Sequence, residues 1–134
     1  MNVVIDTNVV ASAIFFGGKP KKIIELLMVD QIEVFATREI IEEYLDTVDY
    51  LCGKYPVKNP QIALGQIAAK CRIVKNHSKI NVCRVPEDNK FIECAIDSYC
   101  YYVVSGDKDL LTIKEYEGVQ IVTVSEFLEI MKKV

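Results

Sequence analysis

Short runs of apolar residues without polar alternation recur along the chain, and two of them lead directly into acidic residues. Val3-Val4-Ile5 runs into Asp6, and residues 101–104 run into Ser-Gly-Asp-Lys-Asp. Apolar runs this short are typical of strands buried on both faces, as in the middle of a parallel α/β sheet. The same pattern predicts further strands at residues 32–35, 72–74 and 119–124.

Between these strands, apolar residues recur at helical spacing. Thr37 is placed to cap one helix, Pro86 suits the first turn of another, and Ser125 is expected to cap the last. The stretch 77–85 shows no clear pattern. The alternation of helix and strand predicts an α/β fold, a three-layer α/β/α sandwich around a mostly parallel sheet. Helices are expected at residues 9–16, 21–28, 37–48, 61–71, 86–99 and 125–133, with a short helical turn at 110–111.

Composition narrows the class of protein without identifying it. The 134 residues, 51% of them hydrophobic, suit one domain spanning 1–134 with a substantial core. The net charge of −3 disfavours indiscriminate coating of nucleic acid or anionic membranes, although a local basic patch is compatible with it.

The chain shows neither a signal peptide nor an apolar run of about 18 residues, so we expect a cytoplasmic protein that contacts no membrane. Five cysteines without a Cys-x-x-Cys pair, and a single histidine, indicate reduced thiols and argue against zinc.

Acidic residues follow the strands where ligand sites of parallel sheets collect. Asp6 and Asp107 or Asp109 come after two strands whose carboxyl ends should share one edge, while Asp88 lies in the first turn of a helix and Glu43 one turn into another. Each acid alone also has a structural interpretation, as a helix cap, a first-turn residue or a solvated side chain. Together, carboxylates without histidine or cysteine predict a site of hard oxygen ligands, which selects Mg²⁺ or Mn²⁺.

Four segments in this order resemble the PIN-domain ribonucleases, and more narrowly the toxin components of toxin–antitoxin pairs. They are the opening Val-Val-Ile-Asp-Thr-Asn, the stretch 37–44, Pro-Glu-Asp-Asn-Lys-Phe from position 86, and Val-Val-Ser-Gly-Asp-Lys-Asp from position 103. The resemblance implies an acidic quartet of Asp6, Glu43, Asp88 and Asp107, which holds the metal and is catalytic. It also implies supporting roles for Asn8, which would steady Asp6, for Ser105, and for Asp109 as a fifth acid. Glu42 is out of register with the motif, which favours Glu43.

The activity that the resemblance implies is hydrolysis of RNA phosphodiester bonds, assisted by one or two Mg²⁺ or Mn²⁺ ions. The implied partners are an RNA substrate, an antitoxin protein and a second copy of the chain. Two alternatives stay open. An aspartate-nucleophile phosphohydrolase of the haloacid-dehalogenase type also begins with a strand ending in aspartate, but it needs a second aspartate where Asn8 stands. The other alternative is a PIN-fold binding module without catalytic activity.

Overall fold

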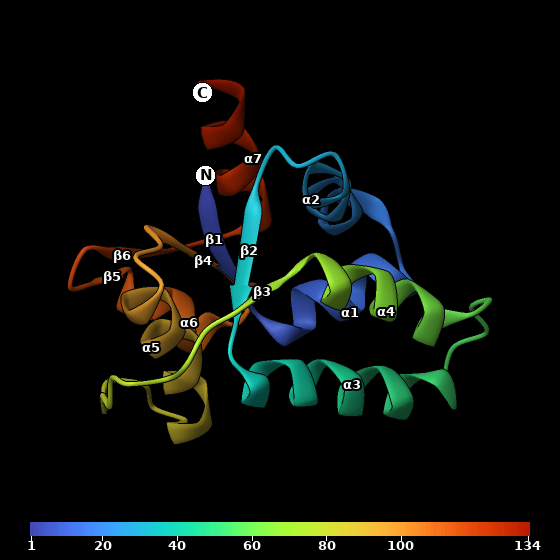
Figure 1. Ribbon diagram of the computed structural model, residues 1–134, viewed down its shortest axis with the longest axis horizontal. Coiled ribbons are helices and arrows are strands. Elements are labelled where there is room, and N and C mark those ends of the chain that lie inside the picture. Colours follow the sequence, from blue (N-terminus) through green and yellow to red (C-terminus); the bar gives the residue numbers. More distant parts are fainter.

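Six strands form one sheet in the order β3-β2-β1-β4-β6-β5 in the computed structural model, which describes residues 1–134 (Figure 1). All neighbouring strands are parallel except β5, which pairs antiparallel with β6. The carboxyl ends of the parallel strands therefore lie at one edge, the lower edge in Figure 1. The strands are β1 (Asn2–Ile5), β2 (Glu33–Ala36), β3 (Arg72–Ile73), β4 (Tyr102–Val104), β5 (Glu115–Tyr116) and β6 (Val119–Val122).

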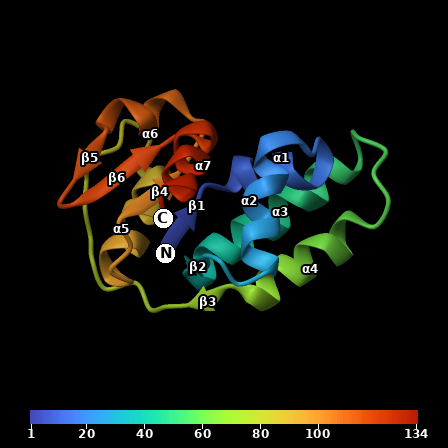
Figure 2. The same ribbon diagram turned by 90° about the horizontal axis from the view of Figure 1, so that it is seen from above.

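Helices cover both faces of the sheet, which confirms the predicted three-layer α/β/α arrangement. Figure 2 shows α5 on one side of the sheet, with α1, α2 and α7 on the other. None of the helices combines the length and apolar character needed to cross a lipid bilayer. The helices are α1 (Thr7–Phe15), α2 (Gly18–Met28), α3 (Arg38–Cys52), α4 (Pro60–Lys70), the 3₁₀ turn η1 (Pro86–Asp88), α5 (Asn89–Asp97), α6 (Lys108–Ile113) and α7 (Val124–Lys132).

The two apolar runs that end in acidic residues form the central strands. Val3 and Val4 of β1 and Val103 and Val104 of β4 are completely buried, as expected for strands covered by helices on both faces. The two strands are neighbours, with Ile5 of β1 opposite Val104 of β4. The residues that follow these strands therefore emerge side by side at the carboxyl edge.

The last helix begins one residue earlier than expected, and its cap is a different residue. Thr123 accepts the Glu126 N–H at 3.1 Å, while the Glu126 side chain accepts the Thr123 N–H at 2.8 Å. This reciprocal capping box belongs to Thr123, so the prediction that Ser125 caps the helix was wrong. Strand β6 ends at Val122, which leaves Thr123 in the capping position. The Ser125 hydroxyl instead accepts a hydrogen bond from Lys19 Nζ.

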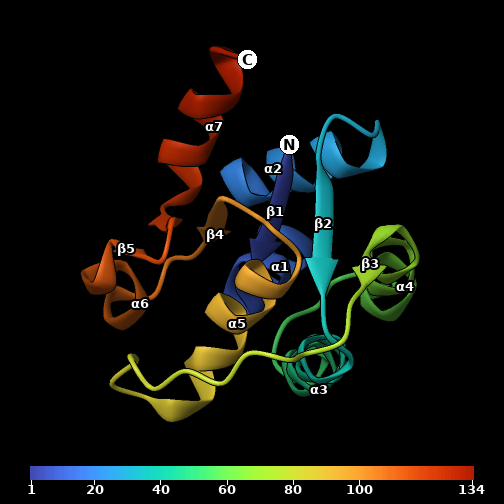
Figure 3. The same ribbon diagram turned by 60° about the vertical axis from the view of Figure 1, so that its left-hand side comes forward.

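Residues 74–85, which we call the strap, connect β3 to η1 without regular secondary structure and run along α5 (Figure 3). Three polar side chains at four-residue spacing on α5 hold the strap. Asn89 accepts the N–H groups of residues 82 and 83, Glu93 accepts the N–H of residue 80, and Asp97 accepts those of 77 and 78. This stretch shows no sequence pattern because five of its backbone N–H groups, at positions 77, 78, 80, 82 and 83, bond to side chains of α5 instead of joining a regular ladder.

Candidate metal centre

Asp6 lies at the carboxyl end of β1, where the sheet register sets it beside Ser105. The Asp6 N–H donates to the Val104 carbonyl at 2.9 Å, which extends the β1–β4 ladder by one residue. The Ser105 hydroxyl donates to Asp6 Oδ2 at 2.7 Å. Asp6 also occupies the N-cap position of α1, but its side chain makes no capping hydrogen bond. Asp6 is only 5% exposed and its carboxylate is held by Ser105, so helix capping does not explain its position.

Ser105 also connects Asp6 to the third acidic segment. Its hydroxyl oxygen accepts the Asp107 N–H at 3.0 Å while its proton is donated to Asp6. Asp107 in turn caps α6, since Asp107 Oδ1 accepts the Asp109 N–H at 3.1 Å. One buried hydroxyl thus fixes the relative positions of two acidic segments that lie about one hundred residues apart in the sequence. They are close in space because β1 and β4 are neighbouring strands.

Glu43 reaches the same edge from α3, whose start is fixed by the expected Thr37 cap on the Ile40 N–H. Glu43 Oε2 accepts a hydrogen bond from the Thr7 hydroxyl at the start of α1. The next residue, Tyr44, is buried and donates its hydroxyl proton to the Ile5 carbonyl at the end of β1. Glu43 and Tyr44 together therefore attach the first turns of α3 to the junction of β1 and α1.

Asp88, in η1, is the fourth member of the acidic group that consists of Asp6, Glu43, Asp88 and Asp107. Burial, followed by the negative charges of Asp107 and Asp6, raises the pKa of the Asp88 carboxyl to about 6. Burial also raises the pKa of Asp6, and the charges of Asp107 and Glu43 add to that rise against the Ser105 hydrogen bond. Carboxylates that disfavour one another's charged forms lie close together. The Ser105 and Thr7 hydrogen bonds bring the Asp6, Asp107 and Glu43 segments to one edge, and the charges of Asp107 and Asp6 act on Asp88 from that edge.

The raised pKa of Asp88 predicts a specific pH dependence for the metal-free protein. Its folded-state pKa, about 6, exceeds the ordinary value of 3.8, so the protonated form favours folding and this stabilisation is lost as pH rises from 3.8 through 6. After allowance for solvent screening the loss is about 1 kcal/mol, or roughly 3–5 °C in Tm. In EDTA, Asp88→Asn should therefore gain Tm over the wild type between pH 5 and 7. A Tm difference that stays constant with pH would contradict this.

Asn8 and Asp109 make contacts other than those expected, whereas Glu42, which the motif register disfavoured, lies outside the acidic group. Asn8 is exposed and makes no hydrogen bond to Asp6, which Ser105 steadies in its place. Asp109 pairs with Arg84 through two bonds of 3.1 and 2.7 Å, and this contact lowers the pKa of the Asp109 carboxyl. Glu42 is exposed and pairs with Arg38 one turn earlier on α3.

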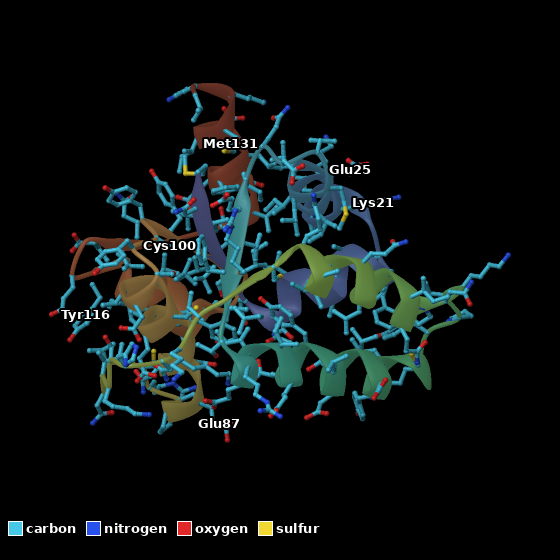
Figure 4. All side chains as sticks on the ribbon, in the orientation of Figure 1. Lys21, Glu25, Glu87, Cys100, Tyr116 and Met131 are labelled. Carbon is cyan, nitrogen blue, oxygen red and sulfur yellow. The ribbon has the colours of Figure 1, made fainter.

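Lys90 forms an ion pair with one of the four acids, and this contact was not evident from the sequence. Its ammonium lies 2.6 Å from Glu43 Oε1 and donates to the Glu87 carbonyl at 2.9 Å. The Lys90 side chain is only 7% exposed. Figure 4 labels Glu87 at the carboxyl edge, at the opposite end of the molecule from Met131. The only sequence signal for this contact was a lysine two residues after Asp88.

The donors at this edge suit a hard divalent ion in their chemistry. All are carboxylate oxygens. Burial raises the pKa values of Asp6 and Asp88 most, and the repulsion from neighbouring carboxylates that adds to this rise is the kind that a divalent cation offsets. As placed, no three His, Cys, Asp or Glu side chains surround a common point in a geometry ready to hold an ion. Thiol ligands are also disfavoured, since burial raises the pKa of Cys71, Cys83 and Cys100 to about 11.

Known proteins match the chain in both sequence and fold. A family model for the PIN domain matches residues 2–109. The uncharacterised protein MJ1680 of Methanocaldococcus jannaschii is 30% identical, over 99% of this chain and 93% of that protein. The structure of PAE2754 from Pyrobaculum aerophilum superposes with a TM-score of 0.67 at 13% identity, covering 100% of this chain and 91% of the other. VapBC2 from Rickettsia felis, bound to a DNA fragment from its promoter, gives a TM-score of 0.55 at 14% identity, covering 92% and 98%.

At these identities the two solved structures show a shared fold, while the family match rests on the sequence itself. The matched residues include all four acidic segments, from Asp6 through Glu43 and Asp88 to Asp107. The chain therefore belongs to the PIN domain family.

Proposed function

We propose that this chain is an endoribonuclease that hydrolyses RNA phosphodiester bonds with the help of Mg²⁺ or Mn²⁺. The observation that carries the proposal is the clustering of Asp6, Glu43, Asp88 and Asp107 at one sheet edge, where burial, followed by neighbouring negative charges, raises the pKa values of Asp6 and Asp88. Perturbed carboxylates gathered at the carboxyl edge of a parallel sheet are typical of functional sites. Membership of a family whose proteins are generally nucleases supports the same reaction class.

Each acid has a defined task in this proposal. Asp6, Asp88 and Asp107 would hold the ion, with Glu43 beside them, and the bound ion would supply an activated water and stabilise charge on the leaving oxygen. Ser105 keeps Asp6 and Asp107 in fixed relative positions, so the carboxylates need little reorganisation before the reaction. Carboxylate oxygens of the same residues would orient that water through hydrogen bonds, so no histidine is required as a base.

Of the two alternative functions, the residues disfavour the first, and only an experiment can decide the second. An aspartate-nucleophile phosphohydrolase needs an acid two positions after Asp6, where the exposed Asn8 stands, and the family match is to a different fold family. A binding module without activity would keep the fold and lose the reaction. The experiment below separates that module from a nuclease.

We extend the proposal to the partners and the setting of the protein. Residues 1–134 act as one domain in the cytoplasm, on an RNA substrate, as one copy of a homodimer. The sequence resemblance to toxin components, together with the shared fold of VapBC2, supports an antitoxin as a further protein partner. Growth arrest on expression of the chain, relieved by a gene encoded next to its own, would test this part alone.

Removal of the metal tests the central proposal. Purified chain stripped with EDTA should leave a structured RNA intact, cleave it at internal positions once Mn²⁺ or Mg²⁺ is added, and stop when excess EDTA follows. A DNA strand of the same sequence should be cleaved far more slowly. Products are resolved on denaturing gels. Equal cleavage with and without EDTA would refute the metal-dependent mechanism, and binding of RNA without cleavage would identify a binding module.

A further inference from the structure

Lys90 is buried beside the acidic group and is held there by fixed contacts. Lysine is almost never fully buried unless it is paired, yet Lys90 is 6% exposed and lies 2.6 Å from Glu43 Oε1. A second bond of 2.9 Å to the Glu87 carbonyl fixes the ammonium group in place. The other Glu43 oxygen accepts a hydrogen bond from Thr7. Both oxygens of Glu43 are therefore engaged, and its charge is balanced by a cation that the chain itself provides.

The three aspartates are in a different electrostatic state. No lysine or arginine forms an ion pair with Asp6, Asp88 or Asp107. Asp6 and Asp107 accept hydrogen bonds from neutral donors, the Ser105 hydroxyl and the Asp109 N–H. The negative charge that remains to be neutralised thus lies on the aspartates. A divalent ion placed next to Glu43 would instead face the ammonium of Lys90 and be repelled by it.

We propose that Lys90 takes the place of a second divalent ion beside Glu43, so that each chain binds one ion, through Asp6, Asp88 and Asp107. Glu43 is then a positioning residue, which holds the ammonium and the start of α1 and does not ligate the ion. The inference rests on the proposed function and specifies how many ions that site uses. The nearby positive charge of Lys90 also offsets part of the repulsion on Asp88.

Metal stoichiometry tests this inference without reference to catalysis. Mn²⁺ alone is titrated calorimetrically into the EDTA-stripped full chain, and the EPR spectrum of the loaded protein is recorded. We expect one Mn²⁺ per wild-type chain and the spectrum of an isolated ion. Lys90→Gln releases Glu43 and should bind a second Mn²⁺, giving the exchange-coupled spectrum of two ions that share ligands. Lys90→Arg keeps the cation and should bind one.

Two further variants guard against a folding artefact. Glu43→Gln combined with Lys90→Gln removes both members of the ion pair and should return the stoichiometry to one. Lys79→Gln changes an exposed lysine near the same edge and should also bind one ion. Two ions in the wild type, or one ion in Lys90→Gln, would overturn the role of Lys90 and leave the proposed nuclease intact. A wild-type chain that binds no Mn²⁺ would overturn the proposed function and this inference with it.

Discussion

The Asp6→Asn variant is expected to lose at least about a thousand-fold in Mn²⁺-dependent RNA cleavage, which corresponds to roughly 4 kcal/mol of transition-state stabilisation. In metal-free buffer the same variant should unfold at a higher temperature than the wild type. Cleavage is measured with RNA in excess Mn²⁺, and Tm is measured in EDTA at pH 7.

The loss of cleavage and the gain in Tm have one physical cause. Asp6 is 5% exposed, and burial raises its pKa, which means that the fold disfavours its charged form. An amide has nearly the same shape, carries no charge, and can still accept the Ser105 proton. Folding therefore gains from the substitution, whereas ion binding loses a carboxylate that no other residue replaces. A residue retained for activity at the expense of stability behaves in this way.

Asp46→Asn is the matched control, since Asp46 is an exposed acid on α3, one turn beyond Glu43. It should change neither cleavage nor Tm appreciably. Asp6→Asn with cleavage within ten-fold of the wild type would remove Asp6 from the reaction. A large fall in Tm together with the lost cleavage would show that Asp6 serves the fold instead.

The parts of the site that the sequence could predict are those fixed by strands. Val3 to Ile5 and residues 102–104 are apolar without alternation, so their burial, their parallel pairing and the emergence of Asp6 beside Ser105 all follow from one rule. The Thr37 cap was predictable for a different reason: a helix cap depends only on residues within one turn of the chain. Local chemistry and sheet topology therefore account for most of the centre.

The parts that the sequence could not predict depend on how one helix is placed against another. Lys90 meets Glu43 only because α5 and α3 approach the same edge, and no spacing along the chain encodes that contact. The antiparallel strand β5 was missed because it has two residues and its turn, at Glu117 and Gly118, lacks the common Asn-Gly signal. The conformation of the strap could not be predicted because its backbone N–H groups donate to side chains of α5, which lie later in the sequence.

Asn89→Ala is expected to lower the free energy of unfolding by about 2–4 kcal/mol, or roughly 10 °C in Tm. Asn89 is 6% exposed, and its side chain makes three bonds to the backbone around it. Its Oδ1 accepts the N–H groups of Val82 and Cys83 at 3.1 and 3.0 Å, and its Nδ2 donates to the Pro86 carbonyl at 2.9 Å. Alanine leaves these backbone groups without partners in a partly buried segment, which is the costly case for a lost hydrogen bond.

The same substitution should also weaken Mn²⁺ binding, because the strap leads directly into η1 and fixes where Asp88 stands. Asn81→Ala is the control: Asn81 lies on the strap, is exposed, and makes no side-chain hydrogen bond. Tm is read by thermal unfolding in EDTA, and Mn²⁺ affinity by calorimetry. If Asn89→Ala destabilises no more than Asn81→Ala, the strap is held by its apolar contacts. If stability falls while Mn²⁺ affinity stays unchanged, Asp88 is positioned by α5 itself, and the polar residues of that helix serve only the fold.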